Sequence, residues 1–259
     1  YVTDTFNHRI QKFDRDGRFV LEWGGFGMVE GGDAALGRLN EPWGLTVSDD
    51  GFVYVADTWN HRVQKFTLTG QPVAVWGRFG DDMDLQNMWG PREVTIGPQG
   101  LVYVSDTGNK RVTVFSPEGE GVRQIGSGGA LDGQIDEPVG LAVSDEGSVF
   151  VADTWNGRVQ LFNGAGDSLR RWEVPGWLGQ SLDNKPYLAV DGEGRVFASD
   201  PEGYRILVWD AIGNPDDLWG DYGSDATSFD LPTGIALDAK GGLYVTDAGN
   251  SRVMYFAPE

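Results

Sequence analysis

The chain contains no cysteine and only two histidines, and both shortages remove whole classes of site. Without cysteine there is no disulfide framework, no thiolate metal site and no thiol nucleophile. Zinc usually takes three or four nitrogen, sulfur or oxygen ligands, so His8 and His61 do not make a zinc site by themselves. We therefore expect both histidines to be exposed loop residues. A serine-hydrolase elbow of the form Gly-x-Ser-x-Gly is also missing.

Long apolar runs and an excess of basic residues are absent too. No stretch of about 18 apolar residues could span a membrane, and no basic-then-apolar leader opens the chain, so we expect no direct membrane contact. The 20 Lys and Arg residues face 39 Asp and Glu residues, which gives a net charge of −19. A surface this acidic repels a phosphate backbone at long range, and no basic patch offsets it. The composition therefore predicts a protein that does not bind nucleic acid.

Glycine and proline, in contrast, are plentiful and evenly spread. The 39 Gly and 12 Pro recur at regular intervals, as many short strands joined by tight turns require. No shift in composition divides the chain, so residues 1–259 are predicted to form a single domain.

One short phrase recurs six times along the chain. It runs from an aromatic residue through an Asp to an Arg five positions after that Asp, as in Tyr54-Val-Ala-Asp57-Thr-Trp-Asn60-His-Arg62. The six aspartates are Asp4, Asp57, Asp106, Asp153, Asp200 and Asp247. Their spacing of 47 to 53 residues, filled with short strands, is typical of the blades of a β-propeller.

Turn residues divide each repeat into four strands. A Pro-x-Gly segment opens the first strand, the phrase occupies the second, the third follows the Arg, and the fourth often ends in Trp-Gly. The predicted fold is therefore all-β, a six-bladed β-propeller of four-stranded antiparallel blades. Because the chain begins at a second strand and ends after a third, the first and last blades should each lack one strand. We accordingly expect a fragment or a domain of a longer polypeptide.

The phrase and the Pro-x-Gly segment together resemble the NHL repeat, and the resemblance covers essentially the whole chain. Two blades depart from the pattern. Glu93 replaces the glycine of a Pro-x-Gly segment, and the fifth blade has Pro201 and Gly203 in its phrase and Lys185-Pro186 one position late.

The repeated Asp, Asn and Arg side chains are predicted to be structural. Asp and Asn can bond backbone N–H groups in the turn, and the Arg can bind the Asp carboxylate. A catalytic constellation serves one site, so its residues should break the repeat and should not recur in six copies.

Binding chemistry is expected on the loops that connect the fourth strand of one blade to the first strand of the next. These loops vary most in length and sequence, and in a propeller they share a face with the loop of the phrase. The face is rich in aromatic residues, namely Phe6, Phe26, Trp43, Trp59, Trp89, Trp155, Trp177 and Tyr222. Aromatic rings serve both recognition and the covering of blade tops, and both roles stay open.

Carboxylates crowd the same loops. Examples are Glu30 with Asp33, and Asp81 with Asp82 and Asp84. Calcium prefers such oxygen ligands, but no segment has the ordered spacing of a known calcium loop. No metal ligand or cofactor is therefore assigned, and calcium is the one ion kept open.

The ligand site is predicted at the mouth of the central channel, beside the Pro-x-Gly segments. Its predicted residues are Glu41, Trp43, Trp59, Arg92, Glu93, Glu137, Trp155, Lys185 and Tyr187.

The favoured function is a non-catalytic recognition domain that binds a protein or glycan on the aromatic loop face, in an extracellular or cell-envelope setting. The alternative is a calcium-centred enzyme of the lyase or lactonase type, with Glu41, Glu93 and Glu137 as candidate acids. The resemblance also implies two activities that the sequence opposes. RNA binding by animal NHL domains uses a basic face, and the related amidating lyase uses a histidine-rich zinc site.

Overall fold

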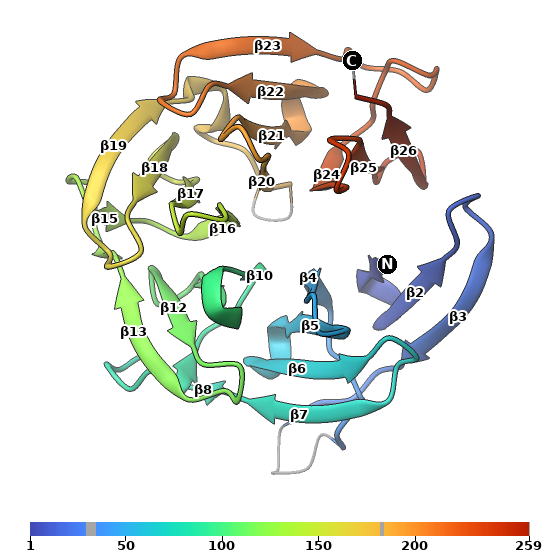
Figure 1. Ribbon diagram of the computed structural model, residues 1–259, viewed down its shortest axis with the longest axis vertical. Helices are drawn as coiled ribbons and strands as arrows, with labels where there is room; N and C mark the ends of the chain where they lie inside the picture. Colours follow the sequence, from blue (N-terminus) through green and yellow to red (C-terminus); the bar gives the residue numbers. More distant parts are fainter. Residues whose placement is uncertain (30–34, 182–183, 259) are drawn as a thin grey trace. The chain divides into compact units, whose positions relative to one another are not determined.

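The computed structural model describes residues 1–29, 35–181 and 184–258, and it consists of small sheets, most of them antiparallel (Figure 1). Six of these sheets contain three or four strands, and each is one blade. The predicted all-β, six-bladed β-propeller is therefore confirmed. Within the described residues, no helix is long and apolar enough to cross a membrane.

The first of two compact units comprises residues 1–127 and holds three blades. The first blade has three strands and the next two have four, and each strand pairs antiparallel with the next one in the chain. The strands are β1 (Val2–Asp4), β2 (Arg9–Phe13) and β3 (Phe19–Gly24); β4 (Pro42–Val47), β5 (Phe52–Asp57), β6 (Arg62–Thr67) and β7 (Pro72–Trp76); and β10 (Val94–Ile96), β11 (Val102–Asp106), β12 (Arg111–Phe115) and β13 (Gly121–Ile125). Between the second and third blades, β8 (Arg78–Phe79) pairs in parallel with β9 (Asn87–Met88).

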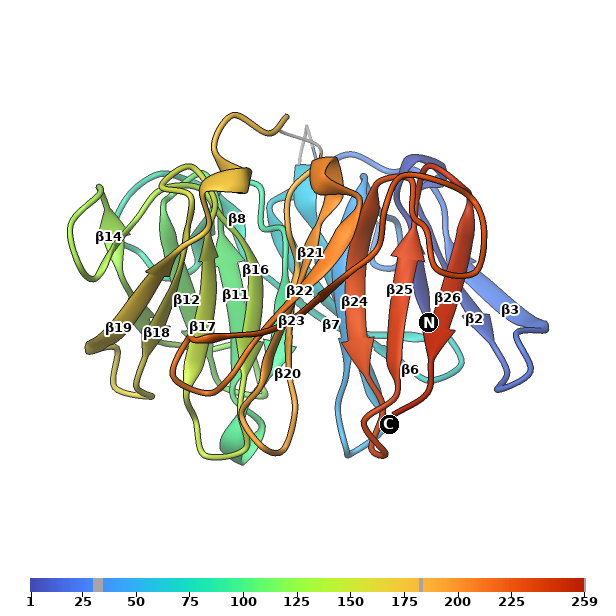
Figure 2. The same ribbon diagram turned by 90° about the horizontal axis from the view of Figure 1, so that it is seen from above.

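The second compact unit comprises residues 128–259 and holds the other three blades, of four, four and three strands. The strands are β16 (Pro138–Val143), β17 (Val149–Asp153), β18 (Arg158–Phe162) and β19 (Ser168–Glu173); β20 (Leu188–Val190), β21 (Val196–Asp200), β22 (Arg205–Trp209) and β23 (Pro215–Trp219); and β24 (Pro232–Leu237), β25 (Leu243–Asp247) and β26 (Arg252–Phe256). Figure 2 shows β24, β25 and β26 side by side, as their antiparallel pairing requires. The short strands β14 (Ser127–Gly128) and β15 (Gln134–Ile135) lie in the connection from β13 to β16.

Short 3-10 turns interrupt the strands. They are η1 (Thr5–Asn7), η2 (Thr58–Asn60), η3 (Pro98–Gly100), η4 (Pro175–Trp177) and η5 (Pro201–Gly203). Three of them, η1, η2 and η5, form the turn of the repeated phrase and end on a residue in the left-handed conformation.

A tryptophan of the fourth strand is enclosed by a turn of the next blade. A Cβ atom on Gly119 would lie 2.7 Å from the Trp76 ring, and one on Gly213 would lie 2.5 Å from the Trp172 ring. Both glycines also have a positive φ, 89° and 84° respectively, which most residues adopt only with strain. Glycine at this turn therefore allows both the positive φ of the backbone and the close contact with the tryptophan of the preceding blade.

The glycine of the Pro-x-Gly segment lets neighbouring first strands approach closely. A Cβ atom on Gly44 would lie 2.6 Å from the backbone oxygen of Arg92 and 2.7 Å from Cα of Glu93. In the second unit, a Cβ atom on Gly140 would lie 2.7 Å from Cα of Tyr187. This close approach fixes the positions of three residues that the sequence predicts to bind ligand.

Candidate functional site

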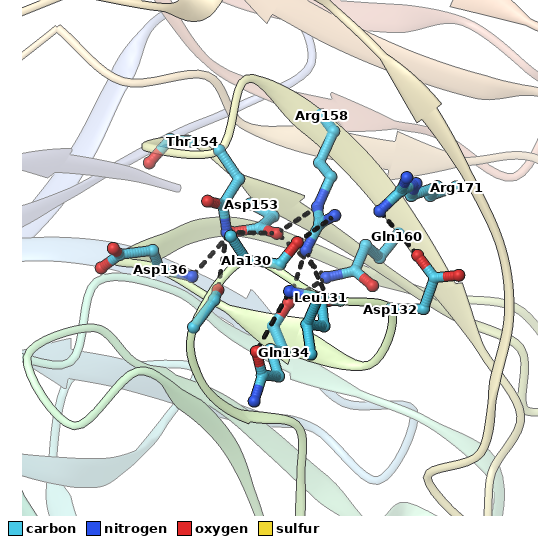
Figure 3. Close-up of polar contacts among 12 residues, drawn as sticks. Ala130, Leu131, Asp132, Gln134, Asp136, Asp153, Thr154, Arg158, Gln160 and Arg171 are labelled. Carbon is cyan, nitrogen blue, oxygen red and sulfur yellow. Dashed lines mark hydrogen bonds and ion pairs between the residues drawn. The ribbon is translucent and has the colours of Figure 1, made fainter.

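The aspartate of the phrase is the centre of a hydrogen-bond network that holds the preceding loop. In the fourth blade, Asp153 accepts bonds from Arg158 Nε at 2.6 Å and from Gln160 Nε2 at 2.9 Å (Figure 3). The Oδ1 atom of Asp153 accepts the backbone N–H of Asp136 at 2.7 Å. Arg158 also donates from Nη1 to the backbone oxygen of Ala130 at 2.9 Å. The phrase therefore fixes the loop between β13 and β16 largely through main-chain atoms.

The bond from Arg to Asp recurs in all six blades. Its Nε to Oδ2 distance is 2.6 to 2.9 Å in the pairs Asp4–Arg9, Asp57–Arg62, Asp106–Arg111, Asp153–Arg158, Asp200–Arg205 and Asp247–Arg252. The predicted bond from the Arg side chain to the Asp carboxylate is confirmed in every blade.

The predicted backbone partner of the aspartate was wrong. In four blades the Asp Oδ1 atom accepts an N–H from 17 positions earlier in the chain and not from its own turn; these donors are Asn40, Trp89, Asp136 and Asp230. The loop from the preceding blade passes beside the turn, and its N–H groups need acceptors there. Gln64 and Gln160, seven positions after their aspartates, join the network and could have been recognised from their shared place in the repeat.

In the fifth blade, a side-chain amide from another segment takes the place of the missing asparagine. A Cβ atom on Gly203, which stands where other blades have Asn, would lie 2.3 Å from Asp200 Oδ2. Gln180 donates instead from Nε2 to Asp200 Oδ1 at 2.7 Å. No sequence signal marked Gln180 for this role, because it lies 20 residues before the aspartate in a loop without a repeat pattern.

The charge state of the buried aspartate follows from its neighbours. Burial raises the pKa of Asp153, and bonds from the Asp136 N–H, from Arg158 and from Asn156 oppose that rise. All of these partners are donors, so the carboxylate form of Asp153 satisfies each of them.

The two histidines are half-buried hydrogen-bond acceptors, so the expectation that they would be exposed is wrong. His8 Nδ1 accepts the backbone N–H of Glu41 at 3.0 Å, and His61 Nδ1 accepts that of Gly90 at 3.0 Å. Burial lowers the pKa of His61, which favours the neutral ring that an acceptor needs. Each histidine thus holds the residue that precedes a proline of the next blade.

In the first unit, the predicted residues Trp43 and Arg92 form a cation–π pair. The guanidinium carbon of Arg92 lies 4.2 Å from the centroid of a Trp43 ring. Arg92 is 8% exposed, and its Nη1 atom is buried with no hydrogen-bond partner in the described part of the chain. The pair therefore contains a buried cation with a donor, Nη1, that the described residues leave without an acceptor.

Glu93 follows directly and has an enclosed carboxyl group, although the residue as a whole is only half-buried. Its Oε1 atom accepts the N–H of Val94 at 3.0 Å and lies 2.6 Å from the position of a Cβ atom on Gly44. Burial raises the pKa of Glu93 to about 8. The carboxyl group is therefore mostly protonated at neutral pH and can exchange its proton within the physiological range.

Replacing Glu93 with glutamine should stabilise the protein at alkaline pH. Because the folded-state pKa of about 8 lies above the ordinary 4.5, folding retains a proton that the unfolded chain loses. The stability this proton contributes is complete below pH 4.5 and is lost as pH rises through 8. We expect E93Q to raise the free energy of unfolding by about 2 kcal/mol at about pH 9, and by less at about pH 5. Urea unfolding at both pH values measures this, with the exposed Glu120→Gln as control, and an equal effect at both would contradict the raised pKa.

Glu41 and Trp59 form a second pair in the first unit. Trp59 Nε1 donates to Glu41 Oε2 at 2.9 Å, and the Trp59 residue is 44% exposed. Glu41 has a φ of 46°, in the left-handed region, directly before Pro42. The pair presents an aromatic ring beside a carboxylate at the surface.

In the second unit, Trp155 and Lys185 lie together. Lys185 Nζ is 5.5 Å from the centroid of a Trp155 ring and donates to the backbone oxygen of Gln180 at 2.9 Å. Tyr187 is buried before β20, and Glu137 precedes β16 with a φ of 45°. The prediction that residues of both units share one ligand site stays a prediction.

The loops of the first unit carry exposed aromatic residues that touch one another. Phe79 lies 4.8 Å from the His61 ring and 6.0 Å from the Trp89 ring, and Trp59 lies 6.4 Å from His61, measured between ring centroids. We call Trp59, His61, Phe79 and Trp89 the aromatic row. Phe79 was missing from the predicted aromatic residues, although it lies within one of the variable loops.

The other predicted aromatic residues divide between surface and interior. Phe6, Phe26, Trp155 and Tyr222 are exposed, whereas Trp43 is half-buried. Trp177 lies in the turn η4 of a connecting loop and is fully buried, so of the two roles left open it has the covering one. It packs with Trp209, at 6.4 Å between ring centroids, in the core of the fourth and fifth blades.

The loop carboxylates are engaged with nearby donors. Asp82 accepts the N–H of Asp84 at 2.8 Å and a bond from Asn87 at 2.6 Å, and these bonds lower the pKa of Asp82. Glu30 and Asp33 lie outside the described residues. Among the residues that are described, no three His, Asp or Glu side chains are grouped so that they could hold a metal ion.

Comparison with known proteins identifies the repeats. Residues 39–66, 88–115, 136–162 and 229–254 each match the family model of the NHL repeat. NHL repeat-containing protein 2 of Bos taurus is 32% identical over 83 residues, which cover 30% of this chain and 11% of that protein. The curated relatives are thus matched over only 7 to 11% of their own length.

Solved structures share the fold at low sequence identity. A gluconolactonase of Xanthomonas campestris has a TM-score of 0.69 at 17% identity, with 98% of this chain and 80% of that chain covered. A virginiamycin B lyase of Staphylococcus aureus has a TM-score of 0.64 at 14% identity, with coverages of 98% and 79%. These similarities extend to the fold alone.

Proposed function

The chain contains four segments that match the NHL repeat, and from that premise we propose that it is a recognition domain that binds a protein or glycan ligand on its aromatic loops. One observation carries the proposal. The polar side chains of the phrase form hydrogen bonds with one another and with the loop backbone, whereas aromatic side chains on the same loops remain exposed. Clustered exposed aromatic residues mark interaction sites in soluble proteins.

The first unit offers the better defined surface. The aromatic row presents three rings that are 44 to 61% exposed, those of Trp59, Phe79 and Trp89. Trp59 also stands beside the Glu41 carboxylate. A ring next to a carboxylate suits a sugar, whose apolar face stacks on the ring while its hydroxyl groups bond to the acid.

An acid–base enzyme of the lyase or lactonase type is the second candidate function. The enclosed carboxyl group of Glu93, with a pKa of about 8, favours it, since such a group can take and give a proton near neutral pH. A calcium centre fits these residues poorly, because Glu41 Oε2 already accepts a bond from Trp59 and no three acidic or histidine side chains of the described residues are grouped.

Removing two rings of the aromatic row should abolish ligand binding. We expect the double variant Trp59→Ala, Trp89→Ala to lose about thirtyfold or more in affinity for the strongest hit from arrays of glycans and peptides, because buried aromatic anchors contribute about 2 kcal/mol or more. Isothermal titration calorimetry measures the loss. The control is Phe19→Ala, which removes a ring that is 54% exposed on β3, away from the loops. Undiminished binding by the double variant would refute the proposed surface, and lactone hydrolysis that disappears in E93Q would favour the enzyme.

A further inference from the structure

Arg92 differs from the other buried arginines of the described chain. Arg62, Arg111 and Arg158 are 6%, 3% and 2% exposed, and each donates to the aspartate of its own phrase. Arg92 is equally buried, at 8% exposed, but no carboxylate of the described residues pairs with its guanidinium group. It is a buried charge without a counter-charge.

Stacking on Trp43 does not offset the burial of this charge. A desolvated cation–π contact contributes about 2 kcal/mol, whereas burying an unpaired ion costs several kcal/mol. The free-energy cost of burying this guanidinium group must be offset by the rest of the fold or by a bound ligand. Sites that bind ligands commonly retain such a cost in the free protein.

The neighbouring acid does not supply the counter-charge. The Glu93 carboxyl group is enclosed against Gly44, and its Oε1 atom accepts the N–H of Val94. Burial raises the pKa of Glu93 to about 8, so the group is mostly neutral at pH 7. Glu93 therefore does not neutralise the charge of Arg92.

Arg92 also lies next to the aromatic row along the chain and in space. Thr58 Oγ1 donates to the backbone oxygen of Pro91 at 2.8 Å, which ties the turn of Trp59 to the residue before Arg92. A Cβ atom on Gly90 would lie 3.7 Å from the Trp59 ring. The backbone that leads into Arg92 therefore contacts the turn that carries Trp59, and Arg92 belongs to a segment beside the aromatic row.

We propose that Arg92, stacked on Trp43, binds a carboxylate group of the ligand recognised by the aromatic row. The inference rests on the proposed recognition function and adds the chemical class of the ligand. A carboxylate is planar and accepts two parallel N–H bonds from one guanidinium group, whose plane the tryptophan restricts. A single negative charge also matches a single arginine, whereas the protein's net charge of −19 disfavours more highly charged anions.

Thermal unfolding with matched small probes tests this. All probes are compared at one common concentration, about ten times the Kd for D-glucuronate. D-Glucuronate should then raise the unfolding midpoint by about 3 °C, acetate should also raise it, and D-glucose, which lacks the carboxylate, should raise it less than glucuronate. A larger shift with glucuronate than with acetate indicates an acidic sugar, and equal shifts indicate a bare carboxylate from any source. Inorganic phosphate shifting the midpoint more than acetate would overturn the carboxylate class.

Two variants separate binding from folding. Arg92→Met keeps the apolar stem on Trp43 and should unfold at the same or a higher temperature than the parent, with no response to glucuronate. A strongly lowered midpoint would make Arg92 structural and overturn the inference. If Arg92→Met does not fold, Arg92→Lys is the second variant. It should lose about tenfold in glucuronate affinity, because lysine keeps the positive charge but lacks the two parallel N–H donors of the guanidinium group. An unchanged affinity would overturn the inference.

The outcome is distinguishable from that of the proposed function. Loss of array binding in the Trp59, Trp89 double variant, together with no effect of any carboxylate on the parent protein, would leave the recognition function standing and remove the anion site. If the carboxylate response needs Arg92 and the double variant still binds its array ligand, the anion site stands and the recognition function of the aromatic row falls.

Discussion

Alanine at Gly44 is expected to destabilise the protein by about 3 kcal/mol or more. The added Cβ atom would lie 2.6 Å from the backbone oxygen of Arg92 and 2.7 Å from Cα of Glu93. Main-chain atoms cannot rotate away as a side chain can, so β4 and the segment before β10 must move apart. The substitution should also displace Arg92 from Trp43 and weaken any response to glucuronate.

Gly234→Ala is the matched control for this prediction. Gly234 occupies the same place in the Pro-x-Gly segment of the sixth blade, but a Cβ atom there would meet only the Thr246 side chain, at 3.1 Å from Oγ1. We expect a cost of about 1 kcal/mol or less for G234A. Urea unfolding of both variants measures the difference. Equal costs would show that close approach of the next strand is not the reason for glycine at position 44.

Alanine at Asp153 is expected to cost about 4 kcal/mol of unfolding free energy. Asp153 is fully buried and accepts bonds from Arg158, Gln160 and the N–H of Asp136. Its removal leaves a buried guanidinium group without a counter-charge and a buried N–H without an acceptor. Breaking a buried ion pair on one side is far more costly than the pair's own net contribution.

Asp4→Ala provides the control at the equivalent position of the first blade. The Asp4 side chain is 24% exposed and that of its partner Arg9 is 34% exposed, so water can solvate Arg9 when the carboxylate is removed. We expect a cost of about 1 kcal/mol for D4A. Chemical denaturation and proteolysis of the loop between β13 and β16 measure both effects. A cost for D153A no greater than that for D4A would contradict the role assigned to burial.

The blades could be predicted from the sequence because the residues of each repeat mark where its strands begin. The phrase marks the second strand, its Arg begins the third, and Pro-x-Gly begins the first, so six copies determine six sheets. In the sequence Gly44 follows the Pro-x-Gly pattern and Glu93 departs from it, and in the structure these two residues lie against each other.

The site could be predicted only in part, because its contacts join segments without a common register. Nothing in the period indicated that Arg92 would stack on Trp43, which lies 49 positions earlier, or that Trp177 would be buried. Gln180, from a loop of irregular length, donates the bond to Asp200 in place of the missing asparagine. The repeat predicts which positions are equivalent but not which side chains from different loops meet.

The network around Asp153 also has a consequence for how this protein can change. Arg158 and Asp153 hold the loop before β16 by its carbonyl and N–H groups, which every amino acid except proline provides. The sequence of that loop can therefore be exchanged while its path is retained. A library of loop sequences placed between Gly129 and Asp136 should yield folded variants at high frequency, which would make the domain a scaffold for selecting new binding proteins.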